Sequence, residues 1–150
     1  MPSNRELIIA TVKENVSLSA FDPATGEVVA VVPVGTKDVS KPHEIAGHVD
    51  LTLYAGPHAL MTDRDGKIWV TVDPNRCVLV IDPDTGEIER TIHLEVPGHF
   101  LAPSPDGNTV YFSAKEYPVV VVVDVATKEI TGRIALPVGG QALRVSPDGA

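Results

Sequence analysis

Three residues with hydrogen-bonding side chains stand at the same place in successive segments of the chain. His58, His99 and Gln141 each lie eight residues ahead of the glycine that ends a turn sequence, DRDG or SPDG. Imidazole binds zinc, copper or iron, and it exchanges a proton near neutral pH. This spacing therefore points to ligand, metal or acid–base chemistry at equivalent points of a repeated structure.

The glycines that end these turns define an internal repeat. Gly66, Gly107 and Gly149 are spaced 41 and 42 residues apart. A period of this length is typical of a four-stranded blade of a β-propeller. We therefore expect the chain to consist of blades, with corresponding residues at corresponding places in each blade.

The turns and the apolar runs between them predict antiparallel strands. In DPDTG, which begins at Asp82, the carboxylate is placed to accept backbone N–H groups two residues on, and the glycine can take a positive φ. The same turn chemistry accounts for Asp22 and Asp124 without a catalytic role. Runs rich in β-branched residues separate the turns, and no long segment has helical periodicity. The chain is therefore predicted to be all-β.

The repeat divides the chain into segments that amount to about three blades. In chain order, 5–35 is an incomplete first blade without its innermost strand, and 36–56 is an irregular insertion or a degenerate blade. Two blades follow at 57–97 and 98–138, and 139–150 contains the innermost strand of a further blade. A ring of three blades is smaller than the usual minimum of four. The chain is therefore expected to be a partial propeller, or to self-associate as half of a two-chain ring.

Strand positions follow from the turns. In the blade at 57–97 the strands are expected at about 58–62, 67–72, 77–82 and 87–95. In the following blade, the run VVVVVDV from Val119 is apolar at consecutive positions, as expected of a strand that is covered on both faces. Stacked neighbouring blades would provide both covers.

Composition and charge exclude several classes of partner. The chain is 43% hydrophobic and carries 12 basic against 20 acidic residues, a net charge of −8. This balance argues against a nucleic acid and against an anionic membrane surface. Cys77, the only cysteine, excludes an intrachain disulfide and is expected to be a small buried apolar residue. No signal peptide or transmembrane helix is predicted, so a cytoplasmic location is the default expectation.

The sequence resembles the YVTN-type bacterial β-propeller repeat. The likeness lies in SPDGNTVYFSA, VVVVVDVATKEITGRIALPVGG and QALRVSPDG, and it covers nearly the whole chain apart from 36–55. The blade containing GPHALMTDRDGKIWVTV is also similar to repeats of streptogramin lyase-like propellers. The first resemblance implies a fold that hosts many functions. The second implies lyase chemistry with a histidine base and a divalent cation. The catalytic residues of those lyases cannot be matched individually to positions in this sequence.

The starts of the innermost strands are the candidate site. In a propeller these strands line a central channel, so their first residues meet at one mouth of it. His58, His99 and Gln141 are therefore candidates to face a ligand, and so are His43 in KPHEI and Arg144 near Gln141. Alternatively, the polar strand start hydrogen-bonds the backbone of the neighbouring blade or channel water. The sequence places no carboxylate beside His58 and His99, so catalytic residues, metal ligands and cofactors stay unassigned, and a divalent metal stays open.

Three functional hypotheses follow from the sequence. The first is a scaffold that binds a small molecule or a protein at a histidine-lined channel mouth. The absence of a nucleophile elbow, an HExxH motif and nucleotide-binding glycine loops favours it. The second is a propeller enzyme, a metal-assisted lyase or lactonase. The third is that this segment alone is inactive because part of any channel site is missing from it.

Overall fold

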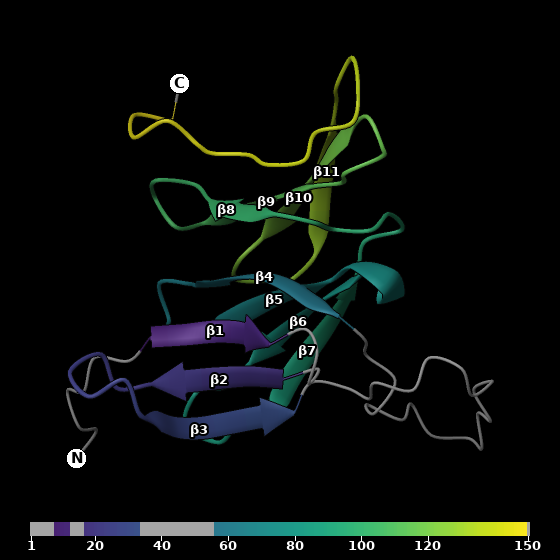
Figure 1. The fold of residues 1–150 in the computed structure, drawn as a ribbon. Coiled ribbons are helices and arrows are strands. Elements are labelled where there is room, and N and C mark those ends of the chain that lie inside the picture. The colour runs from purple at the N-terminus through teal and green to yellow at the C-terminus, as the bar shows by residue number, and fades with distance from the viewer. Residues whose placement is uncertain (1–7, 13–16, 34–55, 150) are drawn as a thin grey trace. The chain divides into compact units, whose positions relative to one another are not determined.

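The described part of the chain is built of β-strands and turns (Figure 1). The computed structural model describes residues 8–12, 17–33 and 56–149, which contain eleven strands and one short 3-10 turn. All strand pairs recorded among these residues are antiparallel, and the chain divides into two compact units, 1–57 and 58–150. The prediction of an all-β protein is confirmed. Within the described residues, no helix has the length and apolar character needed to span a membrane.

The first unit contains a three-stranded antiparallel sheet. Its strands pair in chain order and are β1 (Ile8–Val12), β2 (Ser17–Phe21) and β3 (Val28–Pro33). Asp22 shapes the turn after β2, since its Oδ1 accepts the backbone N–H of Ala24 at 2.8 Å. This sheet lies within the segment predicted over 5–35. The irregular segment that follows it falls almost wholly outside the described residues.

The second unit contains two four-stranded antiparallel sheets, and in each the strands pair in chain order. The strands of the first sheet are β4 (Pro57–Thr62), β5 (Ile68–Val72), β6 (Cys77–Ile81) and β7 (Ile88–His93). Those of the second are β8 (Leu101–Pro103), β9 (Thr109–Ser113), β10 (Val119–Asp124) and β11 (Ile130–Ala135). The bounds in the first sheet agree with the strands expected from the turns to within two residues at each end.

The aspartates that precede these hairpins perform the turn role predicted for them. Asp82 Oδ1 accepts the backbone N–H groups of Asp84 at 2.8 Å and Thr85 at 3.0 Å. Asp124 Oδ1 accepts the backbone N–H of Thr127 at 2.7 Å. Each carboxylate thereby satisfies donors that the tight turn leaves outside the strand ladder.

The two sheets of the second unit stack face to face around one apolar core. The indole of Trp69 in β5 and the ring of Phe112 in β9 lie 6.3 Å apart across it. The buried residues of this core are Trp69, Val78, Val80, Ile92 and Leu94 from the first sheet and its end, and Val110, Phe112, Val121, Val123 and Val125 from the second. This packing fixes the end of the first sheet beside the start of the second.

A polar cluster around Asp63 also joins the two sheets. Asp63, in the turn between β4 and β5, is only 8% exposed. It accepts hydrogen bonds from Trp69 Nε1 at 2.7 Å and from the backbone N–H of Lys67 at 2.9 Å. Lys128, from the turn between β10 and β11, lies 3.5 Å from Asp63 Oδ2 and 4.8 Å from the centre of the Trp69 ring. The buried carboxylate is therefore compensated from both sheets.

The valine-rich strand β10 departs from the expectation that both of its faces are covered. Val121 and Val123 are buried, whereas Val120 and Val122 are half-buried. Val120 and Tyr111 border a hollow of about 300 Å³ instead of a packed sheet. Complete burial occurs in β5 and β6, where every residue is buried. Within the described residues, complete burial is therefore found in β5 and β6 and not in the valine-rich strand β10, for which it was predicted.

The strand expected within 139–150 is also absent from the described residues. The segment 141–149 runs as irregular chain that ends in the turn around Gly149. A strand requires a partner on its edge. No strand among the described residues pairs with this segment, so its backbone does not become part of a ladder.

Candidate functional site

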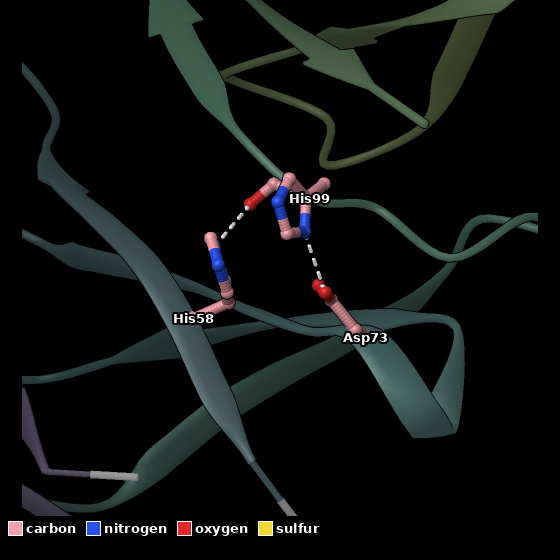
Figure 2. Close-up of side chains that lie close together, drawn as sticks. All are labelled: His58, Asp73 and His99. Carbon is pink, nitrogen blue, oxygen red and sulfur yellow. Dashed lines mark hydrogen bonds and ion pairs between the residues drawn. The ribbon is translucent and has the colours of Figure 1, made fainter. Parts of the chain in front are cut away.

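Two histidines and an aspartate meet where the first sheet of the second unit faces the start of the second sheet (Figure 2). His58 is the second residue of β4, Asp73 follows β5, and His99 precedes β8. The start of β4 lies beside the end of β5 because these strands are antiparallel neighbours. One potential metal-binding atom from each side chain lies within 4.8 Å of the other two.

His99 is held by a carboxylate and by its own backbone. Its side chain is 8% exposed, and its Nδ1 lies 2.7 Å from Asp73 Oδ2. Its backbone N–H donates to the carbonyl of Ser113 at 2.7 Å. Gly98 allows the chain to approach the first sheet closely, since a Cβ at that position would lie 2.4 Å from Leu94 Cδ1. The imidazole is therefore fixed in position and in orientation.

His58 is oriented by the main chain of His99. Its Nδ1 lies 3.2 Å from the carbonyl oxygen of His99. A carbonyl oxygen can only accept, so this Nδ1 carries the hydrogen and the lone pair of the ring lies on Nε2. The two imidazoles stack with centroids 3.7 Å apart, and Phe100 stands edge-on to both at 5.2 Å.

A hydroxyl group under the site ties the two sheets together. Thr71 Oγ1 accepts the backbone N–H of Ala59 at 3.0 Å and donates to the carbonyl of His99 at 3.0 Å. Ser113 repeats the arrangement in the second sheet, where its hydroxyl donates to the carbonyl of Gln141 at 2.7 Å. His99 and Gln141, which begin successive segments, are therefore both held through their backbone carbonyl oxygens.

The carboxylate of Asp73 has one satisfied and one unsatisfied oxygen. Oδ2 faces His99, whereas Oδ1 is buried and has no hydrogen-bond partner in the described part of the chain. Buried polar atoms are nearly always paired, and a carboxylate oxygen without a partner is costly. Oδ1 is therefore able to accept a hydrogen bond or to bind a cation.

The structure brings together two of the five candidates named from the sequence. His58 and His99 are in direct contact. Gln141 is exposed and takes part in the repeat through its carbonyl oxygen. Arg144 is also exposed and lines the hollow beside Tyr111 instead. His43 lies outside the described residues.

Asp73 is the member of this cluster that was not predicted from the sequence. Counted from the equivalent hydroxyl residues Thr71 and Ser113, Lys115 takes the place of Asp73 in the second sheet, so the repeat gives no signal for a carboxylate there. A signal was nevertheless present in the topology. The end of β5 must lie beside the start of β4 in an antiparallel pair, which places Asp73 at the same end of the sheet as His58.

Comparison with known proteins identifies the fold and no family. No protein-family model matches the sequence, and no curated protein matches it. Among solved structures, the chain is similar to Kuenenia stuttgartiensis hydrazine synthase, with a TM-score of 0.76 and 20% sequence identity. The match covers 95% of this chain and 36% of that chain, so this chain spans little more than a third of its length. This likeness concerns the fold alone.

Proposed function

We propose that this chain is part of a YVTN-like β-propeller and acts as a ligand-binding scaffold, with its site at His58, Asp73 and His99. The observation that carries the proposal is the convergence of these side chains from two successive sheets at one end of the stack. Ligand sites usually combine a few convergent polar groups with apolar walls. Phe100 supplies an apolar ring beside both imidazoles.

The propeller part of the proposal rests on the order and stacking of the sheets. Both sheets of the second unit have four antiparallel strands in chain order, and their facing sides share one core. The hydroxyl-to-carbonyl bonds of Thr71 and Ser113 occur at equivalent places, as a repeated blade requires. The similarity to a longer solved structure over 95% of this chain agrees with a repeated scaffold.

A propeller enzyme, a metal-assisted lyase or lactonase, is the second candidate. It is favoured by the contact between His99 Nδ1 and Asp73 Oδ2 at 2.7 Å. A carboxylate that accepts the Nδ1 hydrogen fixes the tautomer and makes Nε2 the proton acceptor, as in catalytic histidine–carboxylate pairs. Such a base could remove a proton from a substrate or from a water molecule that attacks an ester.

The scaffold proposal is tested by NMR of the histidine side chains. The metal-free protein, with isotope-labelled histidine, would be titrated with a mixture of small aliphatic carboxylates, amides and lactones. We expect shifts of the His58 and His99 imidazole resonances and no shift of His93, which is exposed in β7. Shifts confined to other residues, or no shifts at all, would contradict a ligand site here.

The same titration separates the enzyme from the scaffold. Opening of a lactone in the mixture, abolished in His99→Gln and retained in His93→Gln, would establish catalysis. Binding without turnover would favour the scaffold. Glutamine is the chosen replacement because Gln141 occupies the equivalent position in the repeat, so the backbone contacts of His99 should persist.

A further inference from the structure

We propose that His58, Asp73 and His99 form a binding site for a divalent first-row transition-metal ion of the zinc type. The inference deepens the proposed function, on which it rests, because it names the ligand that the scaffold holds. Three features of the cluster carry it: its donor atoms, the orientation of the imidazoles, and the unpaired oxygen of Asp73.

The donor set and its spacing suit such an ion. Two imidazoles with one carboxylate are ligands that Zn²⁺, Cu²⁺, Ni²⁺ and Fe²⁺ accept. His99 Nδ1 and Asp73 Oδ2 are 2.7 Å apart. Tetrahedral bonds of about 2.0–2.2 Å hold two donors about 3.3–3.6 Å apart, so this pair would open slightly on binding an ion. The ion would replace the imidazole hydrogen between the two atoms, and that proton would leave to solvent.

The orientation of His58 matches that of a metal ligand. Histidines that bind metals usually donate the hydrogen of their other ring nitrogen to a carbonyl or a carboxylate, which fixes the ring and its tautomer. His58 makes this contact through Nδ1 to the carbonyl of His99. The hydroxyl of Thr71 donates to the same carbonyl oxygen, which holds the acceptor of the His58 contact in place.

An ion bound through both carboxylate oxygens of Asp73 would also give Oδ1 a partner. A role confined to joining the sheets would use the Oδ2 contact and leave Oδ1 buried without a partner. The junction at Gln141 also shows that the join between segments requires neither histidine nor aspartate, since Gln141 and Lys115 occupy the corresponding positions. A cation beside Asp73 would compensate its carboxylate, and the side chain is 25% exposed, which gives an ion a way in.

The test is calorimetric titration of the chelator-treated protein with zinc chloride. We expect one ion per chain. The variants His58→Gln, His99→Gln and Asp73→Asn should bind zinc more than about 100-fold more weakly, a larger loss than outer-shell changes usually cause. The matched control is His93→Gln, which replaces an exposed histidine of β7 and should bind zinc as the unmodified protein does.

A second measurement protects the test against variants that fail to fold. In the unmodified protein, zinc should shift the imidazole resonances of His58 and His99 and leave those of His93 in place. Absence of zinc binding, or binding that all three site variants retain, would overturn the metal site. If organic probes still shift His58 and His99, the scaffold proposal survives that failure, and if neither zinc nor the probes bind, both proposals fail.

Discussion

The hydroxyl of Thr71 donates to the backbone carbonyl of His99 at 3.0 Å, so a side chain of the first sheet in the second unit holds the main chain that leads into the next. The same hydroxyl accepts the backbone N–H of Ala59 at 3.0 Å. Thr71 is fully buried, and without its hydroxyl the N–H of Ala59 would lose this acceptor and the carbonyl of His99 would keep only the contact with His58 Nδ1. This contact is both the junction of the sheets and the support of the His–Asp–His cluster.

Replacement of Thr71 by valine should therefore destabilise the protein. Valine keeps the shape but removes the acceptor of the Ala59 N–H and one of the two donors to the His99 carbonyl, and an unpaired buried group costs about 1–3 kcal/mol. Urea unfolding followed by tryptophan fluorescence measures the change in the free energy of unfolding. Thr71→Ser retains the hydroxyl and should recover most of the stability. Equal stability of the valine and serine variants would contradict the role given to the bond.

Asp63 should make stability depend on acid pH. Burial alone would raise the pKa of this carboxyl, but hydrogen bonds from Trp69 and Lys67 and the charge of Lys128 lower it below 3.8. The ionised form is therefore favoured by folding. Its contribution is fully present above the unfolded-state pKa of 3.8, and it is lost as the pH falls below that value.

The variant Asp63→Asn tests this contribution. It should be less stable at neutral pH by about 1–3 kcal/mol and should lose less stability than the unmodified protein between about pH 6 and pH 3. Asp82, whose pKa is lowered to about 2 by Lys67 and by backbone N–H groups, continues to respond to acid in both proteins. Parallel pH profiles for the two proteins would show that Asp63 is not the group responsible.

Gly98 should not tolerate a methyl group. An alanine Cβ would approach Leu94 Cδ1 to 2.4 Å, and Leu94 is fully buried, so the core has little room to yield. We expect Gly98→Ala to cost about 1–3 kcal/mol of unfolding free energy through overpacking. Gly132→Ala is the matched control, because its nearest contact would be Val122 Cβ at 3.8 Å. Its effect should stay within about 0.5 kcal/mol, and an equal loss in both variants would refute the steric explanation.

Cys77 should be chemically inert until the protein unfolds. Its side chain is fully buried, and burial raises the pKa of the thiol to about 12, so little thiolate exists at neutral pH. A chromogenic disulfide reagent should react slowly with the native protein and at once in urea. The destabilised Thr71→Val variant should react faster than the unmodified protein. Rapid reaction of the native protein would mean that β6 is accessible.

Much of the local fold could be predicted from the sequence because its turns carry strong signals. The aspartates at 22, 82 and 124 accept backbone N–H groups as expected, and the buried state of Cys77 is confirmed. Burial was harder to predict, since Val120 and Val122 in the valine run are only half-buried. Apolar sequence shows that a face can be covered, but the neighbouring segment decides whether it is.

The site was partly predictable for the same reason. Equivalent positions in a repeat place His58 and His99 at equivalent points of successive sheets, and the structure brings them into contact. Asp73 was not predicted because an aspartate is not repeated at this position, and Lys115 takes its place in the next sheet. Side-chain chemistry that occurs in only one unit leaves no periodic trace, so it has to be found from which strand ends lie together.

The junction between the sheets separates folding from recognition. Thr71 and Ser113 each donate a hydrogen bond to the backbone carbonyl oxygen of the first residue of the next segment. That residue is His99 in one case and Gln141 in the other. The side chain at this position can therefore change without loss of the contact that joins the segments. The residue at each junction can therefore be replaced, and new binding chemistry can arise there with little effect on the fold.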